Sequence, residues 1–275
     1  MNIQDIENLL ISGGIEPNEA KIEVKMMIEH FCNYSVNDLL MGKKLDSSKL
    51  ETVYEKAKTR VQIREPIQYI IGHAEFMKHK YKVTKDVLIP RDETELLVVR
   101  AIESVRERGY KKVLDIGTGS GCIACEIAFY TDAQVLGVDI SSDALRIALE
   151  NSESLNLQNK AIFRKSDIFS GVNEGEKFDL IVSNPPYIPK GTVLQKEVTF
   201  EPEIALFASD EKGIEFYEKI INGAKKYLNE NGKIMFELGI NQFSLVENIL
   251  LKNGFKNVNI EKDLAGIERV ISANI

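Results

Sequence analysis

After Gly109 the chain alternates between short apolar runs and amphipathic helical patterns, and this alternation constrains the fold more than any other feature. The apolar runs typical of strands are "KKVLDIG", "QVLGVDI", "AIFRKSDIF", "FDLIVSNPPY" and "GKIMFELG". Helical patterns such as "CIACEIAFY" and "SDALRIALENSESLNL" separate most of them. Because parallel strands require long crossover connections, the pattern predicts an α/β fold with a mostly parallel sheet covered by helices on both faces.

Two further strand patterns, "KNVNIEKD" and "ERVISANI", end the chain and are joined only by a short turn, "LAG". Strands joined so closely must be antiparallel if they pair. We therefore expect a Rossmann-like, mostly parallel seven-stranded sheet whose last strand is antiparallel.

Helical patterns also fill the chain up to about Arg64, and a looser apolar and polar alternation follows up to Arg91. A chain of 275 residues is long enough for one large domain or for two. We expect an N-terminal helical domain over residues 1–72, a hairpin linker over 73–91 and the α/β domain over 92–275.

Two helix starts are predicted from capping signals. Ser48 and Glu51 form a capping-box pattern at the start of "KLETVYEKAKTRV". Asp92 precedes the helical pattern "ETELLVVRAIESVRERG", and its side chain is expected to cap that helix.

Composition excludes several classes of protein. No apolar stretch approaches the roughly eighteen residues of a membrane span, and the first residues lack the basic region of a signal peptide, so we expect a cytoplasmic protein without a membrane partner. The net charge of −7 argues against extended binding to nucleic acid. Three cysteines make a disulfide framework improbable, and Cys122 and Cys125 are expected to be helix core residues. No cluster of Cys and His has metal-ligand spacing, so no metal site is expected.

The loop "DIGTGSG" follows the first strand of the α/β domain and leads into a helix. Its glycines, at Gly117, Gly119 and Gly121, do not have the dinucleotide spacing G-x-G-x-x-G, and no Lys-Ser/Thr pair follows as in a P-loop. Glycines at this place let the backbone approach a ligand closely at the carboxyl edge of the sheet. The ligand is therefore expected to be a nucleoside that carries something other than a phosphate.

Acidic residues follow the glycine loop at two further strand ends. Asp139 can accept hydrogen bonds from both hydroxyls of a ribose, and Asp167 can accept one from an adenine amino group beside the apolar wall of Ile168. Together with Asp115 they would line a pocket that attracts a cation. This combination indicates S-adenosylmethionine (SAM), which carries a sulfonium.

The stretch "SNPPY" ends the fourth strand at the same edge of the sheet. The residue before a proline is extended, and Pro185 and Pro186 stiffen the loop that follows. The Asn184 side-chain oxygen and the Pro185 carbonyl could hold both hydrogens of a substrate amino group, while Tyr187 offers a stacking face. The loop therefore predicts methyl transfer to a planar amide or base nitrogen.

In this order, "DIGTGSG", "GVDIS", "SDIF" and "SNPPYIP" resemble the class I SAM-dependent amino-methyltransferases, whose domain is Rossmann-like. Three flanking segments narrow the resemblance to the release factor glutamine methyltransferases: "LIPRDETELLV", "FEPEIALFASDEKGIEFYEKII" and "KDLAGIERVI". The resemblance extends from about Pro66 to the C-terminus, and the preceding helices fit the family's N-terminal domain. This sequence departs from the family's pattern at Asp92, where the family often has proline, and at Ile168, where an aromatic residue is common.

The resemblance implies methylation of the side-chain amide nitrogen of the glutamine in the Gly-Gly-Gln motif of peptide chain release factors, with S-adenosylhomocysteine as product. The catalytic and substrate-binding residues would be Asn184, Pro185, Pro186 and Tyr187. The implied cofactor-binding residues are Gly117, Thr118, Gly119, Ser120, Gly121, Asp139, Ile140, Asp167, Ile168 and Asn184. The helical domain would help to dock the release factor, and we expect a monomer.

Two rival functions remain. A DNA or RNA amino-methyltransferase acting on a flipped adenine or guanine explains "NPPY" equally well, although the acidic balance and the absence of a basic recognition domain argue against it. A SAM-sensing or scaffolding protein without activity would be expected to have a damaged acceptor loop, the segment from Asn184 to Tyr187, whereas Asn184 and both prolines are present.

Overall fold

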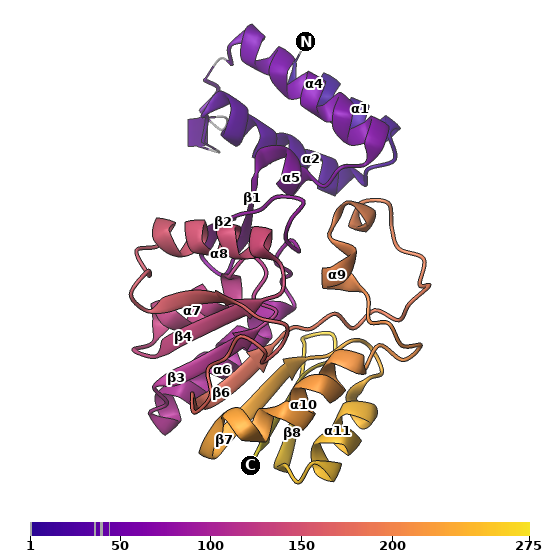
Figure 1. Ribbon diagram of the computed structural model, residues 1–275. Helices are drawn as coiled ribbons and strands as arrows, with labels where there is room; N and C mark the ends of the chain where they lie inside the picture. Colours follow the sequence, from indigo (N-terminus) through magenta and orange to yellow (C-terminus); the bar gives the residue numbers. More distant parts are fainter. Residues whose placement is uncertain (1, 36, 39–40, 44) are drawn as a thin grey trace. The chain divides into compact units, whose positions relative to one another are not determined.

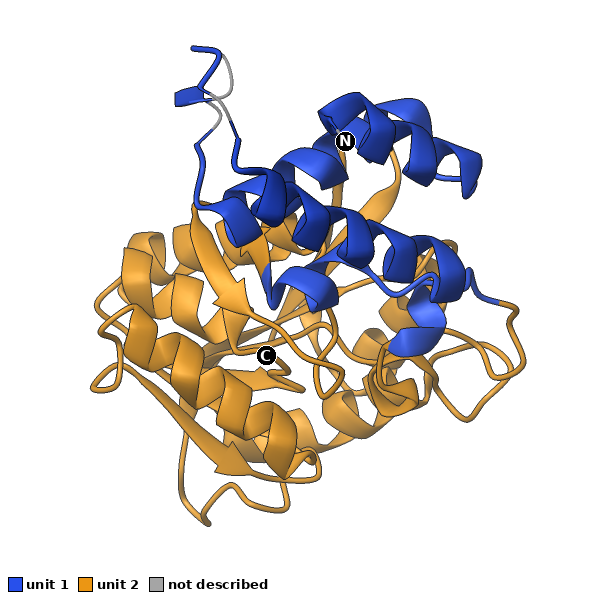
Figure 2. Cartoon of the chain, turned by 90° about the horizontal axis from the view of Figure 1, so that it is seen from above, with its two compact units in different colours: residues 1–73, 194–200 blue, residues 74–193, 201–275 orange. Residues whose placement is uncertain are grey.

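The computed structural model describes residues 2–35, 37–38, 41–43 and 45–275 of the chain. The chain forms two compact units, coloured separately in Figure 2. Unit 1 comprises Met1–His73 and Leu194–Phe200, and unit 2 comprises Ala74–Val193 and Glu201–Ile275. The chain therefore passes between the units three times, because a short segment that follows the acceptor loop belongs to unit 1.

Unit 1 is helical, as its apolar spacing predicts (Figure 1). Its core contains Leu10, Val24 and Val53, which are all fully buried. Its elements are α1 (Ile3–Ser12), α2 (Pro17–Met27), the short π-helix η1 (Ile28–Cys32), α4 (Ser47–Ile63), α5 (Ile67–Ile71) and, from the returning segment, the 3-10 helix η2 (Val198–Phe200).

The predicted capping box at Ser48 is wrong. Helix α4 begins at Ser47, and its N-cap is Asp46, whose carboxylate accepts hydrogen bonds from the Ser48 backbone N–H at 2.9 Å and from the Ser48 hydroxyl at 2.8 Å. Asp46 therefore takes the capping role. The Ser48 hydroxyl donates to the Asp46 carboxylate, and Ser48 lies inside the first turn of the helix.

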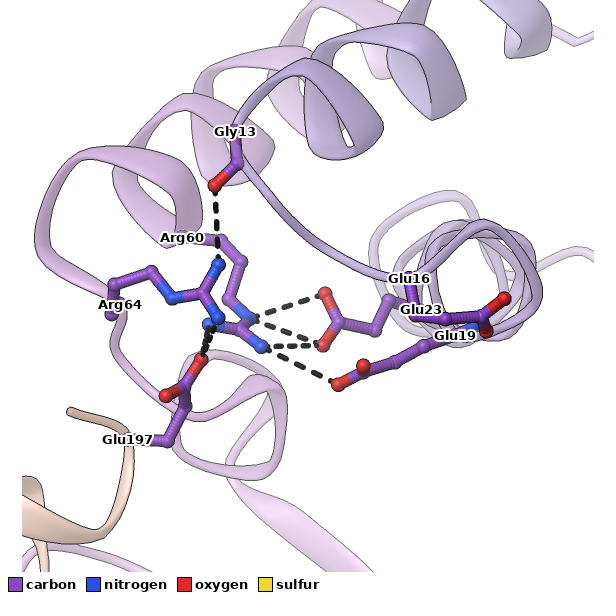
Figure 3. A network of polar contacts seen from close by, with 7 residues as sticks. All are labelled: Gly13, Glu16, Glu19, Glu23, Arg60, Arg64 and Glu197. Carbon is purple, nitrogen blue, oxygen red and sulfur yellow. Dashed lines mark hydrogen bonds and ion pairs between the residues drawn. The ribbon is translucent and has the colours of Figure 1, made fainter. Parts of the chain in front are cut away.

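A buried arginine on α4 joins the returning segment to the helices of unit 1 (Figure 3). The Arg60 side chain is 2 % exposed and donates to both carboxylate oxygens of Glu23, with its Nε 3.1 Å from each. Its Nη1 donates to Glu197 Oε1 at 3.0 Å, and Arg64 Nη2 lies 2.5 Å from the same oxygen. Since a buried guanidinium needs partners for its charge and its N–H groups, this network fixes residues 194–200 to unit 1.

Unit 2 is built on a seven-stranded sheet, which confirms the predicted fold (Figure 1). The spatial order of the strands is β5-β4-β3-β6-β7-β9-β8. The strands β3, β4, β5, β6 and β7 pair in parallel, whereas β9 is antiparallel to both β7 and β8. Their bounds are β3 (Lys112–Ile116), β4 (Gln134–Asp139), β5 (Ala161–Lys165), β6 (Phe178–Ser183), β7 (Leu228–Glu237), β8 (Lys256–Lys262) and β9 (Glu268–Asn274).

Helices pack on both faces of the sheet. One apolar cluster joins α6 (Thr94–Arg108) and α7 (Cys122–Tyr130) to the sheet through residues such as Val113. Another joins α10 (Glu215–Tyr227) and α11 (Phe243–Lys252) to the opposite face through residues such as Leu114. Neighbouring residues of β3 thus point to opposite faces, as strand geometry requires. Unit 2 also contains α8 (Ser142–Ser154), α9 (Glu203–Leu206) and a two-stranded sheet of β1 (His73–Phe76) and β2 (His79–Lys82), in which His73 falls on the boundary with unit 1.

The predicted cap at Asp92 is wrong. Helix α6 begins at Thr94 with Glu93 at the N-cap position, and within the described chain no side chain caps it there. The Asp92 carbonyl instead accepts the Glu95 backbone N–H at 3.1 Å, so this residue is already part of the turn that leads into the helix. The described residues include no helix with both the length and the apolarity that a membrane crossing requires.

Candidate active site

A pocket opens at the carboxyl edge of the parallel strands in unit 2. The pairing of Ile116 with Val138 on one side and with Ser183 on the other brings the ends of β3, β4 and β6 to the same level. Of the residues predicted from the sequence, the pocket is lined by Gly117, Gly119, Asp139, Ile140, Asp167, Ile168, Asn184, Pro185 and Pro186. The glycine loop, two acids and the acceptor loop therefore meet in one cavity.

The glycine loop presents bare backbone to this pocket. Gly117 and Gly119 have φ angles of +72° and +55°, a backbone conformation that is strained for residues with a side chain. Apart from the glycine itself and its two chain neighbours, no described atom lies within 4 Å of a Cβ built on Gly117, and at Gly119 the nearest such atom is the Gly117 carbonyl oxygen at 4.0 Å. The loop is held from behind, because the backbone N–H groups of Gly117 and Thr118 donate to the Val138 carbonyl at 2.8 and 3.0 Å. It therefore forms a cradle that a ligand can approach closely.

Asp139, the last residue of β4, is fixed by backbone hydrogen bonds. Its Oδ2 accepts from Gly119 N at 2.9 Å and its Oδ1 accepts from Ser141 N at 2.9 Å. Burial raises the pKa of this carboxyl, and the Ser141 and Gly119 hydrogen bonds oppose that rise. A carboxylate has about four acceptor positions, so two remain for the two hydroxyls of a ribose. The donor set thus fits the adenosine part of SAM.

Asp115 lies beneath the glycine loop and is not among the residues that line the pocket. Its carboxyl is fully buried and accepts the Thr118 hydroxyl at 2.6 Å, while Oδ1 has no hydrogen-bond partner among the described residues. Burial raises the pKa of Asp115 to about 7. The three acids are therefore not equivalent: Asp139 and Asp167 face the pocket, and Asp115 supports the loop.

The turn after β5 supplies Asp167 and Ile168. Asp167 is exposed, and its backbone N–H donates to Ser170 Oγ at 2.9 Å. Ile168 has a φ of +52°, an uncommon left-handed conformation for a β-branched residue. The Ser166 hydroxyl donates to the Ile168 carbonyl at 2.8 Å and helps to hold this turn. Backbone strain at a pocket wall is typical of functional sites.

The acceptor loop follows β6, whose last residue, Ser183, donates its hydroxyl to the Ile116 carbonyl at 2.7 Å. Asn184, Pro185 and Pro186 line the pocket. Tyr187 lies behind them: its hydroxyl donates to Glu237 Oε1 at 3.2 Å, and burial raises the pKa of the phenol. Four predicted site residues are absent from the pocket lining, namely Thr118, Ser120, Gly121 and Tyr187.

The pocket also has walls that the sequence did not indicate. One comes from the segment before α6 and the other from the region of α9 and α10. These residues are Asp86, Val87, Leu88, Pro202, Ile204, Ala205, Phe216 and Ile220. Most are apolar and carry no chemical signature. Leu88 and the residues near α9 and α10 lie in the flanking segments that carry the resemblance, whereas no sequence signal pointed to Asp86 and Val87.

Comparisons with known proteins show the family of this chain. Residues 108–266 match the family model described as a methyltransferase domain. A release factor glutamine methyltransferase of Clostridium acetobutylicum is 41 % identical over 76 % of this chain and 74 % of its own length. Another, of Bacteroides thetaiotaomicron, is 36 % identical over 94 % of both chains.

Solved structures agree on the fold. A 16S rRNA N2 G1207 methyltransferase of Thermus thermophilus, solved with AdoMet and guanosine, superposes with a TM-score of 0.53 at 23 % identity. The match covers 74 % of this chain and 49 % of that one. With the family model and the relatives, it supports the class I methyltransferase fold. The chain therefore belongs to the release factor glutamine methyltransferase family and is a SAM-dependent methyltransferase.

Proposed function

We propose that this enzyme methylates the side-chain amide nitrogen of the glutamine in the Gly-Gly-Gln motif of peptide chain release factors. The observation that carries the proposal is that the glycine loop and the Asn184–Pro185 acceptor pair line one pocket. The names of the relatives from Clostridium and Bacteroides supply the substrate class.

The donor half of the pocket would bind SAM through groups of this chain. Gly117 and Gly119 would face its methionine part, Asp139 would accept the ribose hydroxyls, and Asp167 with Ile168 would border the adenine. When bound, SAM supplies an electrophilic methyl group on a positively charged sulfur. The carboxylates of Asp139 and Asp167 favour a cation in the pocket.

The acceptor half would orient the amide. The Asn184 Oδ1 and the Pro185 carbonyl would accept the two hydrogens of the glutamine side-chain amide, and the hydrogen bond from the Tyr187 hydroxyl to Glu237 helps to anchor this rigid loop. Holding both hydrogens favours positive charge on nitrogen as the new C–N bond forms. A dedicated strong base is not required, because the proton can leave after transfer. Unit 1 would contribute to docking the release factor.

The direct test is transfer of labelled methyl from SAM to a bacterial release factor and to the same factor with its Gly-Gly-Gln glutamine changed to alanine. Labelling of the first and not of the second supports the proposal. Equal labelling of both, or labelling of DNA or RNA alone, overturns it; the second result would indicate a nucleic-acid amino-methyltransferase.

The division of roles between the two halves has its own test. Asn184→Ala is expected to abolish methyl transfer and leave SAM affinity nearly unchanged, whereas Asp139→Ala is expected to lose SAM affinity. Calorimetric titration with SAM measures the affinity of both variants, and the labelling assay measures methyl transfer. Equal losses of SAM affinity in the two variants would contradict this division.

A further inference from the structure

A chain of buried hydrogen bonds runs from the end of β7 to the acceptor loop. Glu237, the last residue of β7, is 1 % exposed, and its Oε2 lies 2.5 Å from the hydroxyl oxygen of Thr94, the first residue of α6. The same Thr94 oxygen lies 3.1 Å from Asn184 Nδ2. The other carboxylate oxygen, Oε1, accepts the Tyr187 hydroxyl at 3.2 Å. One carboxyl group is thus linked to the acceptor loop at two points, directly at Tyr187 and through Thr94 at Asn184.

The donors and acceptors in this chain can be assigned. An ionised carboxylate only accepts hydrogen bonds, so the single hydroxyl hydrogen of Thr94 must be donated to Glu237. The Thr94 oxygen can then only accept, and the neighbouring atom of the Asn184 amide must be its NH₂ group. The Asn184 Oδ1 consequently has to lie on the opposite side, away from Thr94.

We propose that Glu237 and Thr94 are positioning residues that fix the amide orientation of Asn184, so that its oxygen rather than its NH₂ group faces the substrate nitrogen. This inference rests on the proposed acceptor role of Asn184. The reversed amide would place a donor against the two hydrogens of the substrate amide, and those hydrogens would lose one acceptor. An unrestrained Asn side chain could adopt both orientations, and only one of them is productive.

The same chain links amide orientation to pH. Burial raises the pKa of Glu237 to about 7, opposed by its hydrogen bonds from Thr94 and Tyr187. The other groups that face this carboxyl from neighbouring elements are Glu93, which raises its pKa further, and Arg269, which lowers it. The Tyr217 hydroxyl donates to the Glu237 backbone carbonyl at 2.8 Å and so does not compete for the carboxylate.

Protonation of Glu237 changes the assignment. A neutral carboxyl can donate its own proton to the Thr94 oxygen, and the Thr94 hydroxyl is then free to donate to Asn184 Oδ1. The reversed amide becomes permitted. Productive orientation is therefore expected above the pKa of Glu237 and is lost as pH falls through it.

Substitutions at Thr94 directly test this relay, the chain of hydrogen bonds from Glu237 through Thr94 to Asn184. Thr94→Val has the same shape without the hydroxyl, and Thr94→Ser keeps the hydroxyl. We expect Thr94→Val to lower kcat/KM for the release factor about tenfold or more, the equivalent of one hydrogen bond, with SAM affinity within about twofold of the parent. Thr94→Ser is expected to retain most of the parental kcat/KM. Parental kcat/KM in Thr94→Val, or an equal loss in both variants, overturns the inference.

The pH profile separates positioning from packing. In the parent, kcat/KM is expected to rise with pH through an inflection near 7. Glu237→Gln cannot titrate and Thr94→Val cannot transmit the titration, so both variants are expected to lose this inflection. An inflection that persists unchanged in both overturns the relay, because a structural defect alone would lower the whole curve without changing its shape.

A readout without turnover distinguishes failure of this inference from failure of the proposed function. The side-chain amide signals of Asn184 can be assigned in ¹⁵N NMR spectra by their absence in Asn184→Ala. In the SAM-bound parent they are expected to shift between pH 6 and 8, and in Thr94→Val they are expected not to. If the parent shows this shift but does not methylate release factors, only the proposed substrate is wrong. If the parent does not show the shift, the relay is wrong.

Discussion

Gly119 donates its backbone N–H to the Asp139 carboxylate at 2.9 Å, so the glycine loop and the end of β4 hold each other in place. The acid that is expected to bind the ribose is also the acid that fixes the backbone of the donor cradle. A substitution at either residue should therefore affect SAM binding in two ways, by altering the ribose acceptor and by loosening the glycine loop.

Asp139→Asn is expected to weaken SAM binding by about tenfold to a hundredfold, because the amide keeps one acceptor and replaces the other with a donor. Its NH₂ group would face either the Gly119 or the Ser141 backbone N–H. Calorimetric titration with SAM measures the change. Asp167→Asn is the control, since Asp167 is exposed and is expected to cause a smaller loss. Equal losses would contradict the central role of Asp139.

Gly137→Ala should disturb the glycine loop from below. A Cβ at this position on β4 would lie 2.6 Å from the Phe163 ring and 2.7 Å from Thr118 Oγ1. Overpacking of this kind costs about 1–3 kcal/mol, and the displaced Thr118 belongs to the loop itself. Both a lower unfolding temperature and weaker SAM binding are expected. Parental values of both would show that the loop tolerates the added methyl group.

Arg60→Met should destabilise unit 1, because Glu23 is buried and would lose its charged partner. Removing one partner of a buried ion pair costs about 3–5 kcal/mol, and urea unfolding measures it. Lys58→Met is the matched control on the same helix, since the Lys58–Glu55 pair is exposed and its loss is expected to be undetectable. Similar stability of the two variants would rule out the network of Figure 3 as a stabilising feature.

Asp115→Asn should change how stability depends on pH. Because the folded pKa of Asp115 is raised to about 7, the folded state keeps a proton that the unfolded state has already released, and stability falls as pH rises towards 7. The Asn variant does not have this loss. Its free energy of unfolding, relative to the parent, is therefore expected to increase by about 2–3 kcal/mol between pH 5 and pH 8. A constant difference in urea unfolding across this range would contradict the raised pKa.

The architecture of unit 2 could be predicted because its signals are local. Each strand is a short apolar run, and the length of each connection decides whether a pair is parallel or antiparallel. Helix starts were predicted less well, since Asp46 rather than Ser48 caps α4 and Asp92 does not cap α6. Several neighbouring residues can cap a helix, and the turn geometry chooses among them.

The candidate site was predicted where its residues lie at strand ends, as for Asp139 and Asn184. Thr94 and Glu237 were not predicted, because in the sequence they are ordinary residues of a helix and a strand. They lie 143 positions apart and meet only when α6 packs beside β7. Similarly, nothing in "LQKEVTF" indicated that this segment would join unit 1.

The threefold passage of the chain between the units has a consequence for how the protein can be divided. Proteins whose modules follow one another along the chain can be separated by a single cut, and each piece keeps its own core. Here a cut after His73 would leave residues 194–200 attached to unit 2, and Glu197 would be without Arg60 and Arg64. A single cut therefore cannot separate the two units as they are defined by their contacts, and a truncated variant of either unit has to account for residues 194–200.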